Sequence, residues 1–357
     1  MDSSRRPNLI VVTAPGNELP YSRGLTATSI MGSGLSPEKA YAVAEAVYQR
    51  LLGSGTTKIS ADELEVVIAD ILADLAGEHY AENYRRWTRV GRLDKPLVIL
   101  IGGATGVGKS TVASLLASRL GITRVIPTDA VREVMRGMLT KELMPTLHTS
   151  SFTAEASITQ PLPRSADKAI IGFREQVQVV GVGINALIRR AVIEKTNVII
   201  EGAHCCPGFI EVPRSEDAVA VHLVIAIDSE RLHRSHFAFR SRESGRRPAE
   251  HYLHHFSNIR KIQRYIRNLA LRSGVAVIES YDVEGTVTAC MDLILERVTL
   301  AAKSSASSAK MSGVPDSGES MRRATLPHSK ISAVGGSEGE ASDNMPRLSS
   351  RLERPGG

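Results

Sequence analysis

The segment Gly103-Ala-Thr-Gly-Val-Gly-Lys-Ser110 constrains this chain most, because its G-x-x-x-x-G-K-[ST] spacing is that of a phosphate-binding loop, or P-loop. The apolar run Leu97–Ile101 before it is predicted to be a buried strand, and the run from Thr111 to Leu120 after it a helix. A strand, this loop and a helix in that order favour an α/β fold in which the helix N-terminus faces phosphate groups. The chain is therefore expected to hold a nucleoside triphosphate.

The loop is expected to bind its ligand with both backbone and side chains. Glycines let backbone N–H groups turn towards phosphate oxygens. Lys109 is expected to neutralise the β- and γ-phosphates, and the Ser110 hydroxyl to bind Mg²⁺. The residues predicted to bind ATP are Gly103, Ala104, Thr105, Gly106, Val107, Gly108, Lys109, Ser110 and Thr111.

Length and charge limit the partners that this chain is expected to have. Its 357 residues, 42% hydrophobic and 23% charged, suit a globular protein with more than one domain. A net charge of +6 suits small anionic molecules. The longest basic cluster, Arg240–Arg247, contains no aromatic residue for stacking on a base, so nucleic acid is a disfavoured partner. The oligomeric state is not specified by any of these features.

Cysteine usage and the N-terminus bear on location. Cys205 and Cys206 are adjacent and Cys290 is distant, so the sequence has neither a disulfide framework nor a C-x-x-C metal pair. The N-terminal residues carry no apolar signal segment, and no run of 18 apolar residues is present to span a membrane. A cytoplasmic protein with no membrane partner is expected.

Three regions differ in pattern. Residues 8–90 hold a short strand ending at Val12, a turn at 15–17, a helix opened by Ser36-Pro37, and the capping-box pattern Ser60-Ala-Asp-Glu63. They predict a small, mostly helical domain. Residues 301–357 are rich in serine, glycine and small residues, as in 304–309, and are predicted to be a disordered tail.

Residues 91–300 alternate apolar strands with helical stretches, which predicts a parallel sheet flanked by helices. Ligands are expected at the carboxyl ends of its strands. The predicted strands are Leu97–Ile101, Arg124–Pro127, Asn197–Ile200, Val221–Ile227 and Val275–Glu279.

The segment after the second predicted strand offers a carboxylate and two arginines. Thr128 or Asp129 is expected to cap the following helix, and Asp129, Arg132 and Arg136 share one helical face. Asp129 is the first choice for a base that accepts a substrate hydroxyl proton. The arginines suit a phosphate or carboxylate of the substrate. The alternative is a helix cap followed by a solvated basic face.

The third predicted strand leads into Glu201, the pattern of a carboxylate that orients Mg²⁺. Ser110 and Glu201 are the predicted metal ligands, and Glu201 is the second choice for the base. His204 is predicted to line the substrate site. Zinc is disfavoured there, because two adjacent cysteines do not easily face one ion.

Two further segments are predicted to bind substrate. The polar turn at 143–151 brings His148, Ser150 and Ser151 as candidates. Six arginines follow the fourth predicted strand within 17 residues and suit a lid over the phosphates, although a solvated basic helix is the alternative. They are Arg231, Arg234, Arg240, Arg242, Arg246 and Arg247, of which Arg240, Arg242 and Arg246 are the predicted substrate contacts.

Five segments in this order resemble the 2-phosphoglycerate kinase family: Gly102–Ser110, Thr128–Arg136, Leu147–Phe152, Val198–His204 and His255–Gln263. Residues 8–90 resemble an ATP-cone, a small helical nucleotide-binding module, with Pro20-Tyr-Ser-Arg23 and Tyr84-Arg-Arg-Trp87 as the similar segments. The resemblance covers about residues 8–298.

The resemblance implies a P-loop kinase that uses ATP to phosphorylate 2-phospho-D-glycerate at its 3-hydroxyl, giving 2,3-bisphosphoglycerate and ADP. The residues implied in catalysis are Lys109, Asp129, Glu201 and Arg132, with ATP and Mg²⁺ as cofactors and a small phosphorylated anion as partner. Two alternatives stay open. One is a kinase for another phosphorylated acceptor, such as an inositol phosphate or a nucleotide. The other is a nucleotide-gated regulator without an acceptor.

Overall fold

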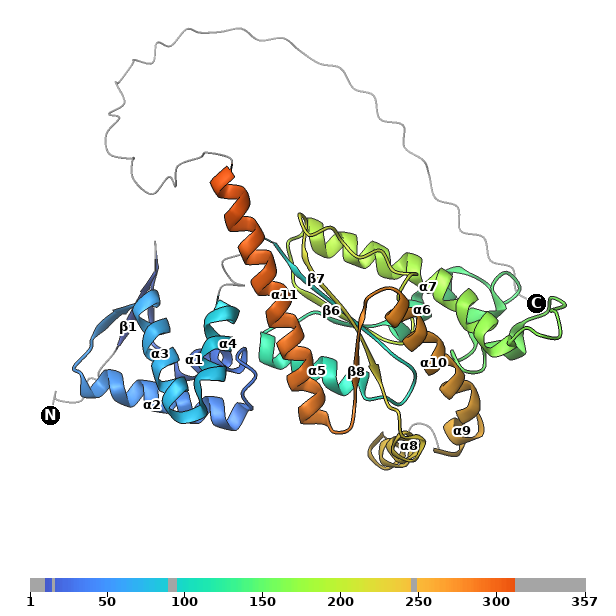
Figure 1. The fold of residues 1–357 in the computed structure, drawn as a ribbon, viewed down its shortest axis with the longest axis horizontal. Helices are drawn as coiled ribbons and strands as arrows, with labels where there is room; N and C mark the ends of the chain where they lie inside the picture. Colours follow the sequence, from blue (N-terminus) through green and yellow to red (C-terminus); the bar gives the residue numbers. More distant parts are fainter. Residues whose placement is uncertain (1–9, 15–16, 89–94, 245–248, 312–357) are drawn as a thin grey trace, which may run out of the picture. The chain divides into compact units, whose positions relative to one another are not determined.

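The structure is a computed structural model, and it describes residues 10–14, 17–88, 95–244 and 249–311 (Figure 1). The chain contains two separate sheets, one in the described residues up to 88 and one in those from 95 onwards. The predicted turn at 15–17 lies partly outside the described residues, as does nearly all of the predicted tail.

The N-terminal region is mostly helical, as predicted, but it also contains a three-stranded sheet in the order β2-β1-β3. Only one of these strands was expected, because β2 and β3 each contain a single large apolar side chain, Leu19 and Ile59, and so show no apolar run. Helices α2 and α3 bury the apolar residues that recur at helical spacing, including Val43, Val47 and Leu72. The elements are β1 (Val11–Ala14), β2 (Asn17–Pro20), α1 (Arg23–Met31), α2 (Pro37–Gly53), β3 (Lys58–Ser60), α3 (Ala61–Ala76) and α4 (Glu78–Thr88).

The second sheet has five parallel strands in the order β5-β6-β4-β7-β8, which confirms the predicted fold class. Each predicted strand is present with ends shifted by one or two residues. The largest shift is in β7, which begins earlier because the Val219 amide already bonds to the Pro96 carbonyl beside β4. The strands are β4 (Leu97–Gly102), β5 (Val125–Pro127), β6 (Val198–Glu201), β7 (Val219–Ala226) and β8 (Ala276–Glu279).

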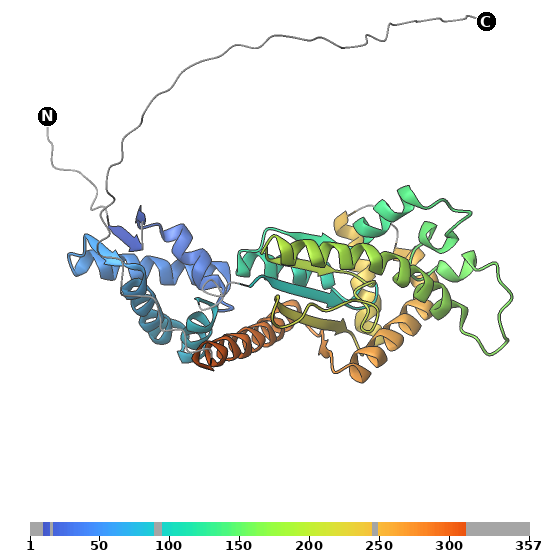
Figure 2. The same ribbon diagram turned by 90° about the horizontal axis from the view of Figure 1, so that it is seen from above.

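Helices cover both faces of this sheet. Side chains alternate between faces along a strand, so Leu97, Ile99 and Ile101 of β4 pack into one apolar cluster and Val98 and Leu100 into the other. The first cluster includes residues of α5, α10 and α11, and the second includes the C-terminal half of α7, from Val180 to Ala191. Figure 2 shows α7 on one side of the sheet and α10 and α11 on the other. These helices are α5 (Lys109–Leu120), α6 (Thr128–Met138), α7 (Lys168–Ile193), α8 (Glu230–Ser244), α9 (Ala249–His254), α10 (Phe256–Arg272) and α11 (Val283–Met311).

Two helices bear on the sequence predictions. Helix α11 continues past the predicted boundary at residue 300, as far as Met311. Serine and alanine in this stretch can extend a helix that is already anchored by buried residues such as Ile294 and Val298. Helix α7 is, in the described part of the chain, the one helix long and apolar enough to cross a membrane by length and composition. It is a core helix here, since Val180 and Ile184 are fully buried.

Strand order determines where a ligand binds. From β4 the chain passes to β5 at one edge, and from β6 it crosses β4 to reach β7 on the other side. A parallel sheet opens a crevice at the carboxyl ends of its strands at such a reversal. The loops after β4, β5, β6 and β7 therefore converge on one place.

A matched pair of helix caps tests the N-terminal region. The Ser60 hydroxyl accepts a hydrogen bond from the Glu63 amide, and the Glu63 carboxylate accepts one from the Ser60 amide. Ser36 makes no side-chain cap hydrogen bond at the start of α2. We expect Ser60→Ala to lower the free energy of unfolding by about 1 kcal/mol. The control Ser36→Ala is expected to change it by less than about half of that. Urea unfolding is followed by the fluorescence of Trp87, the single tryptophan. Trp87 lies on α4, which packs against α3. Equal losses in the two variants would contradict the capping-box assignment.

Candidate active site

The loop from β4 into α5 has the features that a phosphate site requires. Gly108 caps α5 in a left-handed conformation and offers no side-chain hydrogen bond to the first helical amides. Those amides and the helix dipole together favour an anion at this end of α5. The predicted nucleotide-binding residues 103–111 form this turn, and Ser110 and Thr111 at its end are exposed.

Lys109 lies at the centre of the turn. Its side chain is 8% exposed and its Nζ donates to the Ala104 carbonyl at 2.7 Å. The ammonium group is therefore held over the same loop whose amides point at the ligand position. A charge in this place suits the β- and γ-phosphates of a nucleotide.

Ser110, in the first turn of α5, contacts Glu201 at the end of β6. The Ser110 hydroxyl donates to Glu201 Oε1 at 2.7 Å, and Glu201 is 6% exposed. The contact arises because β4 and β6 pair in parallel with Ile101 opposite Glu201. A hydroxyl and a carboxylate are the oxygen ligands that Mg²⁺ accepts, with phosphate oxygens and water completing the shell. The donor pair therefore fits the predicted magnesium site.

Helix α6 presents Asp129 and Arg132 to the same crevice. The predicted cap is wrong, because Pro127 is the N-cap residue and Thr128 turns its hydroxyl inward. Asp129 has 77% of its side chain exposed and lies 3.8 Å from an Arg132 nitrogen. Arg132 has 12% of its side chain exposed and donates to the Thr149 carbonyl at 2.7 Å. The carboxylate is open to a ligand, while the arginine is held by the segment that follows α6, residues 140–157, which we call the acceptor loop.

His204 is fully buried in a polar network. Its Nε2 lies 3.0 Å from Gln176 Oε1, an acceptor, so Nε2 carries the proton, and its Nδ1 accepts from the Thr128 hydroxyl at 2.9 Å. Gln176 in turn donates to the carbonyls of Thr146, at 2.6 Å, and Thr149. His204 thus connects β6 to α6 and to the acceptor loop, and its predicted part in the substrate site would be exerted through these neighbours.

Gly202 makes this network possible. Its φ is +151°, and a Cβ there would lie 1.8 Å from Thr128 Oγ1. Only glycine lets the turn after β6 approach α6 so closely. The segment Glu201-Gly-Ala-His204 therefore delivers a carboxylate to the metal position and an imidazole to the buried network.

The pKa of His204 is lowered to about 4, chiefly by burial; the positive charges of Arg132 and Lys109 contribute to the lowering, and Asp129 opposes it. The imidazole is therefore neutral at physiological pH, as its hydrogen bonds require. These charged groups act on one ring because the fold brings them together around it. Burial also raises the pKa values of the thiols of Cys205 and Cys206, so both cysteines are protonated.

The acceptor loop contains the 3₁₀ turns η2 (Pro145–His148) and η3 (Ala154–Ser157). His148 Nε2 donates to the Leu139 carbonyl at 2.9 Å, which holds the loop against the end of α6. Ser150 is half-buried and Ser151 is 9% exposed. The structure brings this loop to Arg132 and Gln176, beside the crevice.

The other arginines predicted to contact the substrate differ in how far the structure describes them. Arg136 pairs with Glu133 on α6 at 2.7 Å. Arg240 and Arg242 belong to α8, but their side chains lie outside the described ones, and Arg246 lies outside the described residues altogether. Their predicted part in a lid stays a prediction.

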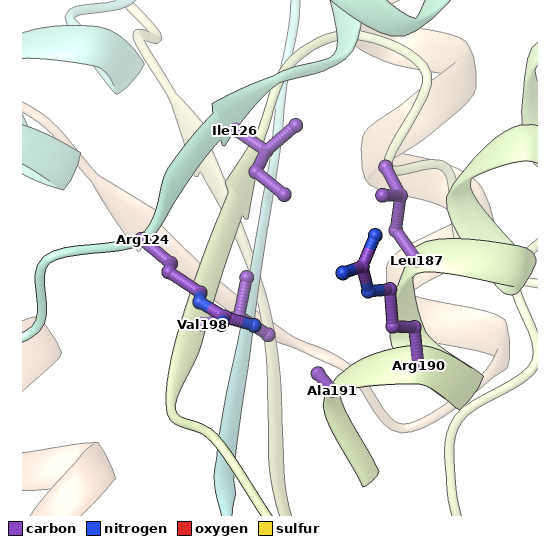
Figure 3. A pocket seen from close by; sticks show the side chains of 6 residues that line it. All are labelled: Arg124, Ile126, Leu187, Arg190, Ala191 and Val198. Carbon is purple, nitrogen blue, oxygen red and sulfur yellow. The ribbon is translucent and has the colours of Figure 1, made fainter. Parts of the chain in front are cut away.

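A separate hollow of about 230 Å³ lies at the opposite end of the sheet (Figure 3). It is bordered by Arg124 just before β5, Val198 at the start of β6 and Arg190 near the end of α7. These are the amino ends of the strands, where no catalytic loop gathers. Arg124 and Arg190 both pair with Glu194. We assign the chemistry to the crevice after β4 and β6 instead.

Sequence reasoning missed Gln176. It occupies a position on the buried face of α7, between the core residues Phe173 and Val180, and is itself 0% exposed. A polar side chain on an otherwise apolar helical face is the signal that marks it. Its function depends on carbonyls about 30 residues away in the chain, which no local pattern reveals.

The buried histidine generates a pH prediction. Its pKa is near 6.5 in an unfolded chain and about 4 in the folded protein. Between these values the unfolded state binds a proton that the folded state does not, so stability falls as pH falls from 6.5 to 4. We expect His204→Gln to reduce that slope by up to about 1.4 kcal/mol per pH unit.

Urea unfolding at several pH values between 7 and 4.5 measures this slope. The exposed His254→Gln variant serves as the control and is expected to keep the wild-type slope. An unchanged slope in His204→Gln would mean that His204 is protonated in the folded state and would contradict the network described above.

No protein-family model matches the chain. Among solved structures, a shikimate kinase from Acinetobacter baumannii covers 57% of this chain and 94% of its own at 17% identity with a TM-score of 0.32. This likeness is too slight to add to what the coordinates show.

Curated relatives are much more similar. The 2-phosphoglycerate kinase of Methanothermobacter thermautotrophicus is 38% identical over 281 residues, which are 78% of this chain and 90% of the relative. Those of Pyrococcus horikoshii and Thermococcus kodakarensis are 40% and 38% identical, with 91% and 98% of the relative covered. Identity of this extent, over most of each chain, shows that the chain belongs to the 2-phosphoglycerate kinase family.

Proposed function

We propose that this protein transfers the γ-phosphoryl group of ATP to the 3-hydroxyl of 2-phospho-D-glycerate, giving 2,3-bisphosphoglycerate and ADP. The observation that carries the proposal is the 2.7 Å contact between Ser110 and Glu201 at the end of the P-loop. It supplies a metal-binding oxygen pair at the point where the phosphates of a nucleotide would lie. The acceptor is proposed because the curated relatives bear the name 2-phosphoglycerate kinase.

Ser110 and Glu201 would hold Mg²⁺, which would supply positive charge to neutralise the phosphates. Lys109, 8% exposed at the end of the same loop, would add a second positive charge at the β- and γ-oxygens. The amides of the P-loop and of the first turn of α5 orient the triphosphate. Most of the rate enhancement is therefore expected from positioning and charge stabilisation.

Asp129 is the better candidate for the base. The Glu201 carboxylate is buried and engaged with Ser110, whereas Asp129 is exposed to the crevice at the N-terminal turn of α6. In the proposed step Asp129 accepts the proton of the 3-hydroxyl, and the hydroxyl oxygen forms a bond to the γ-phosphorus. The bond from that phosphorus to the bridging oxygen breaks, and ADP leaves.

Arg132 and Arg136 are proposed to hold the acceptor. A 2-phosphoglycerate molecule carries a phosphate and a carboxylate, both of which suit guanidinium groups. Arg132 is braced by Thr149, so its planar group is positioned before the acceptor arrives.

The three cysteines are buried and unpaired, which supports the proposal that the protein works in a reducing, cytoplasmic environment.

An acceptor screen tests the function. Purified protein with ATP and Mg²⁺ is given 2-phosphoglycerate, other three-carbon phosphates, inositol phosphates or nucleoside monophosphates, and ADP formation is measured. We expect turnover with 2-phosphoglycerate, and a loss of at least about 100-fold in Lys109→Ala. The exposed Lys39→Ala is the control. Turnover with a different acceptor would replace the proposed substrate, and ADP formation without any acceptor would indicate an ATPase.

A second pair of variants separates the base from the metal ligand. We expect Asp129→Asn to lower kcat by about 100-fold or more while leaving the Mg²⁺ concentration for half-maximal rate unchanged. Glu201→Gln is expected to raise that Mg²⁺ concentration by about tenfold or more. Rates measured across a Mg²⁺ series check both. The assignments would be exchanged if the Asp129 variant shifted the Mg²⁺ dependence and the Glu201 variant did not.

A further inference from the structure

Helix α8 contacts the outer side of the P-loop through two histidines. His233 Nε2 lies 2.8 Å from the Thr105 carbonyl oxygen, and His236 Nδ1 lies 3.0 Å from the Gly106 carbonyl oxygen. A carbonyl oxygen only accepts, so both ring nitrogens donate. The two histidines are three residues apart and share one face of α8.

Fixing these carbonyls also fixes the amides that follow them. In a trans peptide the C=O and the next N–H lie in one plane and point in opposite directions. A Thr105 carbonyl held towards α8 turns the Gly106 N–H to the other side of the loop. The Gly106 carbonyl, held by His236, does the same for the Val107 N–H. These are amides of the loop in which the triphosphate is proposed to lie.

The protonation state of His233 is determined by its surroundings. The ring is 0% exposed, and burial lowers its pKa to about 4. The hydrogen bond to Thr105 opposes this lowering, and nearby Arg260, His236 and Lys109 contribute to it. With Nε2 donating, Nδ1 is an acceptor, and it lies 3.5 Å from an Arg260 nitrogen. The neutral tautomer required by the Thr105 contact is the one that its other neighbours favour.

Arg260 anchors this arrangement to the sheet. It donates to the carbonyls of Ile227, at 2.6 Å, and Asp228, at 2.9 Å, directly after β7. Gln263, one turn further along α10, donates to the same Ile227 carbonyl at 2.8 Å. The contact chain therefore runs from the end of β7 through Arg260 and His233 to Thr105.

Aromatic packing fixes the position of the His233 ring. It stacks on Phe237 at 5.4 Å between centroids and meets the edge of Phe256 at 5.4 Å. Phe237 in turn stacks on Tyr252 at 4.9 Å. Gly106 has a φ of +88°, and a Cβ there would lie 2.4 Å from Phe237, so the loop fits closely against this surface. A ring held in this way offers its donor in one direction only.

We infer that His233 and His236 are positioning residues, which orient the Gly106 and Val107 amides towards the triphosphate and so set the affinity of the P-loop for ATP. The inference depends on the proposed binding of ATP at this loop, but not on the identity of the acceptor. His233 and His236 touch the backbone behind the loop and act on the ligand through it.

The test compares variants that remove or keep each donor. His233→Phe keeps a stacking ring and loses the donor, and His233→Gln keeps an N–H near the position of Nε2. His236→Leu loses its donor, and His236→Asn keeps one near Nδ1. His236 is half-buried, so its variants preserve the experiment if His233→Phe fails to fold. The exposed His254→Phe on α9 is the control for the added apolar ring.

Binding of a non-hydrolysable Mg²⁺–ATP analogue is measured by calorimetry without acceptor, with Lys109→Ala defining the heat that does not come from the P-loop. We expect His233→Phe to raise the Kd by about tenfold, as for a lost hydrogen bond to a buried carbonyl. His233→Gln should stay within about threefold of the wild type. His236→Leu is expected to show a smaller rise, which His236→Asn reverses.

In steady-state assays the KM for ATP should rise in the donor-less variants while the KM for the acceptor stays constant. A folded His233→Phe or His236→Leu variant with unchanged Kd would overturn the inference. So would an equal rise in the donor-less and donor-keeping variants, because the loss would then come from packing. Failure of the proposed acceptor alone would leave these binding results intact, which keeps the two proposals distinguishable.

Discussion

The parallel pairing of β4 with β6 is the constraint on which the site depends. Its register places Glu201 opposite Ile101, one residue before the end of β4. The P-loop then turns back into α5 and carries Ser110 to within 2.7 Å of the Glu201 carboxylate. A slip of one residue would send Glu201 to the other face of the sheet, because side chains alternate along a strand. The proposed metal site thus follows from backbone hydrogen bonding in the core.

Buried polar side chains hold the acceptor loop in place beside the strands. His204 and Gln176 have no exposed surface, and each uses both ends of its side chain in hydrogen bonds. A buried polar group that loses its partner costs on the order of 1–3 kcal/mol, so the network strongly favours one arrangement of the acceptor loop. Arg132 is aimed into the crevice by the same loop, through Thr149. Substrate groups would meet side chains that are already positioned.

Helix α10 has a comparable role on the nucleotide side. Asn258 donates to the Phe152 carbonyl and to Glu155 at 2.7 Å, which ties the helix to the acceptor loop. Further along the same helix, Arg260 and Gln263 donate hydrogen bonds to the Ile227 carbonyl after β7. The segment His255–Gln263 resembled the kinase family in sequence, but nothing local indicated its purpose. Its polar residues connect the acceptor loop, the sheet and α8, and His233 extends the connection to the P-loop.

The sequence alone determined the local features. The P-loop, its flanking strand and helix, the five strands and the Ser60 capping box each depend on residues within a few positions of one another, and all are present. The positions of Asp129 and Glu201 at strand ends also followed, because the carboxyl ends of parallel strands gather at one edge. The predicted cap at Thr128 was wrong, since a hydroxyl that suits a cap can equally bond to a distant imidazole, as it does with His204.

Only the tertiary structure determined which side chains hold the site residues in position. Gln176, His233 and Arg260 act on partners 27 to 128 residues away in the chain, and no pattern in a short window links such positions. Strand order, helix packing and the close approach at Gly106 and Gly202 brought them together. Local sequence specified which groups are available for the proposed phosphoryl transfer. The packed core specified how those groups are held, because hydrogen bonds between distant segments form only when the sheet has placed their ends side by side.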